Sequence, residues 1–235
     1  FSGDSNNPFR CSKKFKDNWE EYFNLITKGL SLRECAKKMN ITIVTSFFWR
    51  HRFLNDLKER NYIAKIGSYV ELTKMVTLEN FKGDRKYHGE KRDKIIVINA
   101  LNNYNDVLPI IAGRSFFGFY EIRDNLIPRL DKHAYVVGYT DSRLKLFSKA
   151  FNEINKRKLD NENISRMDIM YSIKVKKWLS KFKGVASKYL DHYLSWRVFE
   201  YKNNSEDRKD SFFIKTSNID INIKAEINTY SSWNN

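Results

Sequence analysis

Three hydroxyl groups and two guanidinium groups lie close together in the sequence, on Thr42, Thr45, Ser46, Arg50 and Arg52. Side chains of these types bond to phosphates and to base edges when a helix carries them into a major groove. They can do so only if the helix leaves them on its exposed face. We therefore ask which elements would position them.

The segment from Leu30 to Leu57 predicts two short helices joined by a tight turn. The residues expected on the buried faces are Leu32, Ala36 and Met39 in the first helix and Val44, Phe47, His51 and Leu54 in the second. Residues 40–42 form the break, and Thr42 is a typical N-cap. This pattern predicts a DNA-binding helix-turn-helix; the alternative is an ordinary helix pair with a solvated charged face.

The charge of the chain favours a polyanionic partner. The 235 residues include 43 Lys and Arg against 28 Asp and Glu, which gives a net charge of +15 that is spread along the chain. No apolar run approaches the roughly 20 residues that span a bilayer, and the first residues lack the apolar core of a signal peptide. We expect a globular protein that binds double-stranded DNA and no membrane, in the cytoplasm at the nucleoid or in a nucleus.

Cysteine and histidine give no sign of a structural metal. Cys11, Cys35 and the four histidines lack the paired spacing of a zinc site, so we predict no complete zinc site within this chain. Cys35 falls in the first helix of the pair, where we expect a small buried apolar residue. The two cysteines predict no disulfide framework, which suits a reducing compartment.

The remaining elements are predicted from their periodicity. Runs rich in β-branched residues predict strands at 68–76, 94–101, 107–112 and 134–140, and Pro109 places the third strand at an edge or a bulge. Helices are expected at 18–28, at 115–130 with Ser115 as its cap, at 142–158, and over 165–201 with a break at Gly184. Strand-like segments follow at 219–223 and 227–230. Three antiparallel strands, a helix, a parallel strand and further helices are the order of an RNase H-like α/β core.

Two segments far apart in the chain carry a family resemblance. SLRECAKKMNITIVTSFFWRHRFL and IKVKKWLSKFKGVASKYLDHYLSW resemble the helix-turn-helix and the C-terminal helical signature of Merlin-related bacterial insertion-sequence DDE transposases with an ISXO-type catalytic domain. Gly67 to Glu71 stands where such proteins begin their first catalytic strand, and Tyr139 to Asp141 stands where their fourth ends. The likeness spans roughly residues 10 to 200, a domain-length match. FRCSKKF resembles the end of the zinc ribbon that precedes the helix-turn-helix in the family, with Cys11 as its remaining ligand.

The resemblance implies a two-metal site. Family members hold two Mg²⁺ or Mn²⁺ ions with three carboxylates, or with two carboxylates and an amide, for phosphoryl transfer. Their first-strand pattern Val-Glu-x-Asp-Glu falls on Val70 to Lys74, which puts Thr73 at the first ligand position and Lys74 at the following acidic one. Asp141 is at the second position, and Asp168 falls near the third after a one-residue shift. A hydroxyl is a weak ligand, and an ammonium repels a cation.

Glu71 is a candidate replacement ligand, because residues i and i+2 of a strand face the same side. In the plainer interpretation, Glu71 forms an ion pair with a nearby Lys or Arg, and Asp141 is a helix N-cap or a turn residue. If the fold is as predicted, Thr73 and Asp141 should face a common cleft between neighbouring strands. The catalytic candidates are therefore Asp141, Asp168 and Glu71, with Asp141 as a weak Mg²⁺ ligand.

The predicted fold class is α/β, an RNase H-like mixed sheet of the DDE-transposase type with an N-terminal helix-turn-helix and C-terminal helices. We divide the chain into a zinc-ribbon-like remnant at 1–16, a helix-turn-helix domain at 17–60, an RNase H-like domain at 61–201 and an extension at 202–235. The favoured interpretation is a domesticated or degenerate transposase that binds DNA and has lost cleavage. The alternatives are an active Mg²⁺- or Mn²⁺-dependent DDE transposase with displaced ligands, and a protein-interaction module that kept the fold. A homodimer is compatible with each.

Overall fold

The chain divides into two compact units, and each is described by itself. The computed structural model describes residues 13–82, 89, 91–139, 141–158, 168–182 and 185–203. One unit holds the described residues of Phe1–Arg60 and Ser195–Asn235, and the other holds those of Asn61–Leu194. The described residues form mixed α/β structure, with a single four-stranded sheet in the second unit.

The first unit is helical and is held together by aromatic rings. It contains α1 (Lys13–Thr27), α2 (Leu32–Lys38), most of α3 (Ile43–Ile63) and the later residues of α7 (Leu190–Lys202). Phe23 of α1 packs against Phe53 of α3 and against Trp196, with ring centroids 5.2 and 5.9 Å apart. Burying such rings contributes on the order of 2 kcal/mol each, which makes this cluster the main source of stability in the unit.

Local sequence signals set the helix ends in this unit. Gly29 takes a φ of 79°, a left-handed conformation that suits glycine and ends α1. Ser31 and Glu34 form a capping box at the start of α2, because the Ser31 hydroxyl accepts from Glu34 N–H and the Glu34 carboxylate accepts from Ser31 N–H. Thr42 accepts from the N–H of Thr45 at 3.0 Å, which confirms its predicted capping role for α3.

The second unit is built on a mixed sheet. Its strands are β1 (Tyr69–Leu78), β2 (Lys94–Asn102), β3 (Val107–Arg114) and β4 (Tyr135–Gly138), in the order β3-β2-β1-β4. β1, β2 and β3 are antiparallel neighbours, whereas β4 runs parallel to β1. The four predicted strands are therefore confirmed, and so is the edge position of the strand that carries Pro109.

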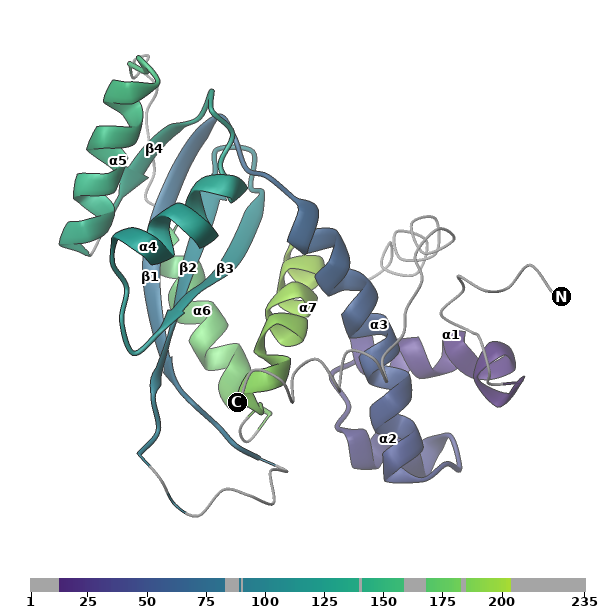
Figure 1. The fold of residues 1–235 in the computed structure, drawn as a ribbon. Helices are drawn as coiled ribbons and strands as arrows, with labels where there is room; N and C mark the ends of the chain where they lie inside the picture. Colours follow the sequence, from purple (N-terminus) through teal and green to yellow (C-terminus); the bar gives the residue numbers. More distant parts are fainter. Residues whose placement is uncertain are drawn as a thin grey trace, which may run out of the picture. The chain divides into compact units, whose positions relative to one another are not determined.

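Helices cover both faces of this sheet. Even-numbered residues of β1 and β2, such as Leu72 and Ile98, enter an apolar core with Leu144 and Phe151 of α5 (Ser142–Ile154). The opposite, odd-numbered face packs under α6 (Asp168–Ser180). Figure 1 shows α4 (Phe119–Glu121) and α6 on opposite faces and α5 alongside β4. The alternation of side chains on each strand thus decides which helix a residue meets.

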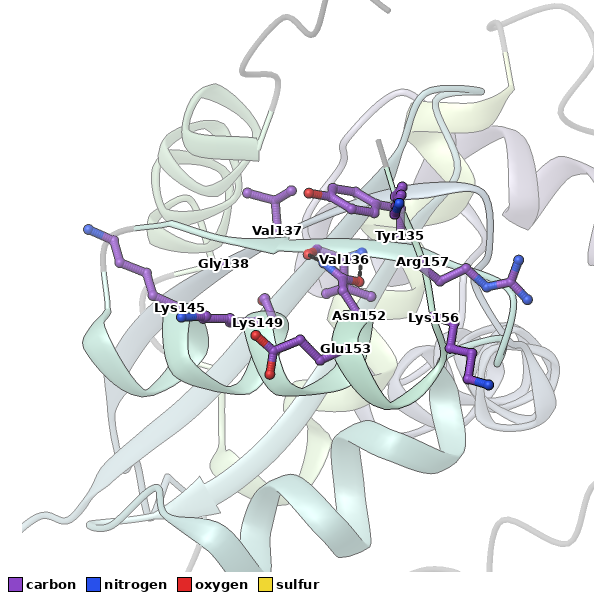
Figure 2. A pocket seen from close by; sticks show the side chains of 12 residues that line it. Tyr135, Val136, Val137, Gly138, Lys145, Lys149, Asn152, Glu153, Lys156 and Arg157 are labelled. Atoms are coloured by element: carbon purple, nitrogen blue, oxygen red, sulfur yellow. Dashed lines mark hydrogen bonds between the residues drawn. The ribbon is translucent and has the colours of Figure 1, made fainter. Parts of the chain in front are cut away.

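Helix α5 covers the outer edge of β4. The Asn152 amide donates to the carbonyl of Val136 at 2.8 Å and accepts from its N–H at 2.9 Å, as a neighbouring strand would (Figure 2). Two residues further along β4, a Cβ on Gly138 would lie 2.4 Å from the backbone of Leu144. The close approach of α5 to this edge therefore requires glycine at position 138.

The structure differs from the predicted elements in one helix. Residues 115–130 do not form a single helix capped by Ser115, which instead takes a positive φ of 54°. The helix begins after Gly118 and passes through α4, a π-helical turn η1 (Ile122–Leu126) and a 3₁₀ turn η2 (Ile127–Arg129). Pro128 lacks an N–H donor and favours this tighter ending.

The predicted C-terminal helical region is present as α6, the 3₁₀ turn η3 (Ser187–Tyr189) and α7. The predicted break at Gly184 lies outside the described residues, as do Cys11, most of 1–16, the strand-like segments at 219–223 and 227–230 and most of the extension at 202–235.

Replacing Gly138 with alanine should destabilise the protein by about 2 kcal/mol or more, because the new methyl group meets helix backbone that cannot move aside cheaply. Urea unfolding of both proteins measures this. Ser142→Ala, at an exposed position in the first turn of α5, is the control and should change stability by less than about 0.5 kcal/mol. Equal effects of the two substitutions would contradict the close approach.

Candidate functional site

Lys74 and Asp141 form an ion pair at the end of the parallel strand pair. Lys74 belongs to β1, and Asp141 follows β4, whose last residue Gly138 lies opposite Leu72. The ammonium of Lys74 donates to Oδ2 of Asp141. Their side chains are 27% and 11% exposed, so the pair is largely shielded from solvent. A strand exit of this kind brings together residues 67 positions apart in sequence.

The second oxygen of Asp141 caps helix α5. Oδ1 accepts from the N–H groups of Arg143 at 2.9 Å and Leu144 at 3.4 Å, which confirms the plainer N-cap interpretation of this residue. Burial by itself would raise the pKa of Asp141, but the Lys74 ammonium and the two helix N–H donors outweigh it and hold the pKa below its ordinary value. Both oxygens of the carboxylate are therefore engaged by groups of the protein.

Thr73 and Glu71 lie on the other face of β1. Side chains alternate along a strand, so these two residues project away from Lys74 and toward the face covered by α6. Both are buried, at 4% and 3% exposure. The prediction that Thr73 and Asp141 face a common cleft is therefore wrong, because Asp141 is bound by the residue that points to the opposite side.

A buried amide accompanies Thr73 on this face. Asn99 of β2 lies directly opposite Thr73 in the strand register and is fully buried. Its Nδ2 donates to the hydroxyl of Ser172 on α6 at 2.9 Å. This polar contact ties α6 to the centre of the sheet. The sequence reasoning missed it, because the pairing of Thr73 with Asn99 depends on strand register.

The two-metal site that the family resemblance implies does not fit this arrangement. Among the described residues, no three His, Cys, Asp or Glu side chains lie close enough together to hold a metal ion. Asp168 begins α6, but its side chain lies outside the described part of the structure. Asp141 already contacts an ammonium, and Glu71 lies on the far face. Asp141 and Glu71 therefore do not converge on one site, as ligands of two divalent cations would have to.

The helix pair α2 and α3 buries two of the residues that we expected to meet DNA. Ser46 is fully buried, donates to the carbonyl of Leu32 at 3.0 Å and bonds to the hydroxyl of Tyr22 at 2.7 Å. Arg50 is 3% exposed and donates to the carbonyl of Leu30 at 2.7 Å. The prediction that Ser46 and Arg50 contact DNA is wrong. Both instead satisfy backbone carbonyls at the α1–α2 connection.

The burial of Ser46 and Arg50 was not predicted because the buried face of α3 differs from the one expected from the sequence. Val44, predicted to be buried, is 64% exposed, whereas Trp49 and Phe53 take the buried positions with Leu54. His51 and Leu54 are buried as predicted, so the buried surface of α3 is wider than predicted and also includes Ser46 and Arg50. The buried Ala36 and Met39 of α2, and buried Cys35, agree with the prediction. The sequence of α3 carried this signal in Trp49 and Phe53, large aromatic residues outside the predicted buried face.

Three of the five candidate DNA-binding residues remain near the surface. Thr42 is exposed, while Thr45 and Arg52 are half-buried. The hydroxyls of Thr42 and Thr45 also bond to each other at 2.9 Å. The preceding helix α2 carries three exposed cations that were not singled out from the sequence, Arg33, Lys37 and Lys38.

Comparisons with protein-family models, with curated proteins and with solved structures find no match to this chain. Within the described ranges, no helix combines the length and the apolar character needed to cross a membrane.

The Lys74–Asp141 pair should make stability depend on pH. The lowered pKa of Asp141 means that its charge stabilises the folded state above the unfolded pKa of about 3.9, and that this contribution is lost as the pH falls through the lower folded value. Asp141→Asn keeps a capping oxygen but removes the charge, so it should cost about 1–2 kcal/mol at pH 7. The deficit relative to wild type, measured by urea unfolding, should shrink below about pH 4.

Lys74→Met is the matched variant, because it removes the ammonium and keeps the aliphatic stem. It should cost a similar amount at pH 7 and, likewise, less as the pH falls. A deficit that stays constant from pH 7 to pH 3 in both variants would show that the pair does not stabilise the fold electrostatically.

Proposed function

We propose that this protein binds double-stranded DNA and derives from an insertion-sequence DDE transposase whose metal-dependent cleavage site has been lost. The observation that carries the loss of cleavage is the ion pair of Lys74 with Asp141. In a two-metal enzyme, that carboxylate would hold a divalent cation. Here one oxygen of Asp141 accepts from the Lys74 ammonium, and the other accepts from N–H groups at the start of α5.

The order of the elements supports an RNase H-like core. Three antiparallel strands come first, a helical segment follows, and β4 then adds parallel to β1 on the side away from β2. α5 and α6 complete the sequence of elements. Asp141 stands at the exit of β4, where the resemblance places the second carboxylate. On this proposal, the protein keeps the frame of a metal site, while β1 has Thr73 and Lys74 where the family pattern has two acidic residues.

The helix pair and the charge support DNA binding. Residues 39–42 join α2 to α3, and the α3 N-terminus begins with the exposed Thr42, Ile43 and Val44. Exposed apolar side chains at such a position can contact thymine methyl groups, and the cations of α2 can contact phosphates. With a net charge of +15, the whole chain is attracted to a polyanion. We therefore assign the DNA contact to the start of α3 and to Arg33, Lys37 and Lys38 of α2.

Replacing these three cations should weaken DNA binding. The variant Arg33→Gln, Lys37→Gln, Lys38→Gln should lose about tenfold or more in affinity for duplex DNA near 0.1 M salt. The slope of log affinity against log salt should also fall by about 1 for each phosphate contact removed. Fluorescence anisotropy with a labelled duplex measures both quantities.

The control removes an equal charge elsewhere. Lys174, Lys176 and Lys177 are exposed on α6, and their replacement by glutamine should change affinity by less than the α2 variant does. Arg50→Ala is unsuitable for this purpose, because loss of its buried bond to Leu30 would destabilise the helix pair. Identical losses in the α2 and α6 variants would reject the assignment to α2.

The purified protein should not nick DNA in Mg²⁺ or Mn²⁺ above background. Relaxation of supercoiled plasmid measures this, with Asp141→Ala as the comparison. A divalent cation should stabilise the Lys74→Glu variant, which places a second carboxylate beside Asp141. It should not stabilise the Thr73→Asp variant, whose new carboxylate projects from the opposite face of β1. Robust wild-type nicking that Asp141→Ala abolishes would overturn the proposed loss of cleavage.

A further inference from the structure

A groove runs between the edge strand β4 and helix α5. It encloses about 880 Å³ and has β4 residues 135–138 along one wall and α5 along the other. Five cations line it, namely Lys145, Lys149, Lys156, Arg157 and Lys158, against a single carboxylate, Glu153. Figure 2 shows Lys145, Lys149, Glu153 and Lys156 extending from the helical wall and from the residues just after it. The groove is therefore strongly positive.

Four of the five cations of this groove are not used to hold the fold, whereas the fifth, Arg157, bonds to the ring of His133. The ammonium groups of these four lysines, Lys145, Lys149, Lys156 and Lys158, are on exposed residues and form no ion pair or hydrogen bond within the described part of the chain. Lys145 and Lys149 lie one helical turn apart, about 6 Å along the axis. Exposed ammonium groups in a row repel one another, so a structural role would cost stability. An anionic ligand that follows α5 would remove this repulsion.

The groove does not suit an acidic peptide added as a strand. A peptide binds a sheet edge through the outward backbone groups of the edge strand. At β4, the N–H and the carbonyl of Val136 already bond to the Asn152 side chain. Because the Asn152 amide occupies both of these groups, Val136 offers no backbone donor or acceptor to an incoming strand.

Single-stranded nucleic acid is also a poor fit. Proteins that bind single strands combine a positive groove with aromatic faces on which bases stack. The one aromatic residue of the lining, Tyr135, already stacks on Tyr69 with ring centroids 6.1 Å apart. The lining therefore supplies five cations but a single aromatic ring that is already stacked on one face, which favours contact with a phosphate backbone whose bases remain paired.

We propose that the β4–α5 groove is a second DNA-binding surface, which holds the phosphate backbone of a duplex without reading its sequence. The identity of the ligand rests on the proposed DNA binding. The location does not depend on the helix pair, since every residue of the groove belongs to the α/β unit. Lys145, Lys149 and Lys156 are the phosphate contacts, and Glu153 opposes them.

The test compares charge variants of the 235-residue chain in anisotropy titrations with a labelled duplex of random sequence. Lys145→Gln, Lys149→Gln, Lys156→Gln should lose about tenfold or more in affinity, and its salt slope should fall by about 2–3. Glu153→Gln should bind a few-fold more tightly than wild type, because it removes the opposing charge. The equal-charge control on α6, Lys174→Gln, Lys176→Gln, Lys177→Gln, should lose clearly less, and thermal unfolding checks that all variants fold.

Three other outcomes would each overturn the proposal for the groove, and the pattern of binding distinguishes them. Loss of binding in the α2 variant, with the groove variant equal to the α6 control, would reject the groove and leave the proposed function standing. A wild-type protein that binds no duplex at 50 mM salt would reject the proposed function and the groove together. Groove-dependent binding of a single strand or of labelled polyglutamate, tighter than that of the duplex, would assign the groove to that ligand instead.

Discussion

The carboxylate of Asp141 connects the sheet to the helix that follows it. One oxygen accepts a hydrogen bond from the ammonium of Lys74 on β1, and the other accepts from the N–H groups of Arg143 and Leu144 in the first turn of α5. Negative charge is favourable at a helix N-terminus and beside an ammonium, so the same group satisfies both needs. The direction in which α5 leaves the sheet, and therefore the position of its lysines over β4, depends on this residue.

The edge of β4 is controlled by the same helix. α5 approaches so closely at Gly138 that a side chain there would meet helix backbone, and Asn152, in the last turn of the helix, pairs with Val136. An open strand edge invites association with other chains, and a side-chain amide that occupies its backbone groups blocks that route. Beside this blocked edge lies the β4–α5 groove, which we propose recognises its ligand through the positive charges of its lining.

The helical unit shows how buried polar groups shape a surface. Tyr22, Ser46 and Arg50 bond to one another or to the backbone near the α1–α2 connection and fix the turn between the helices. Burial raises the pKa of Tyr22 to about 12, so its hydroxyl stays a neutral donor across the physiological range. Polar side chains turned inward leave Ile43 and Val44 exposed at the start of α3. The surface offered to a partner is thus partly apolar, with its cations on α2.

The sequence by itself determined the strands, most of the helices and several of their ends, because β-branched runs, capping residues and Gly29 act through local backbone preferences. It also offered a helix N-cap as the plainer alternative to a metal ligand for Asp141, and it marked Lys74 as a positive charge that would repel a metal ion. Only the tertiary structure decided which face each side chain takes. Strand pairing set Thr73 against Asn99, on the face away from Lys74 and its partner Asp141, and packing around more of α3 than predicted buried Arg50. Such outcomes depend on contacts between residues distant in sequence, which local preference does not encode.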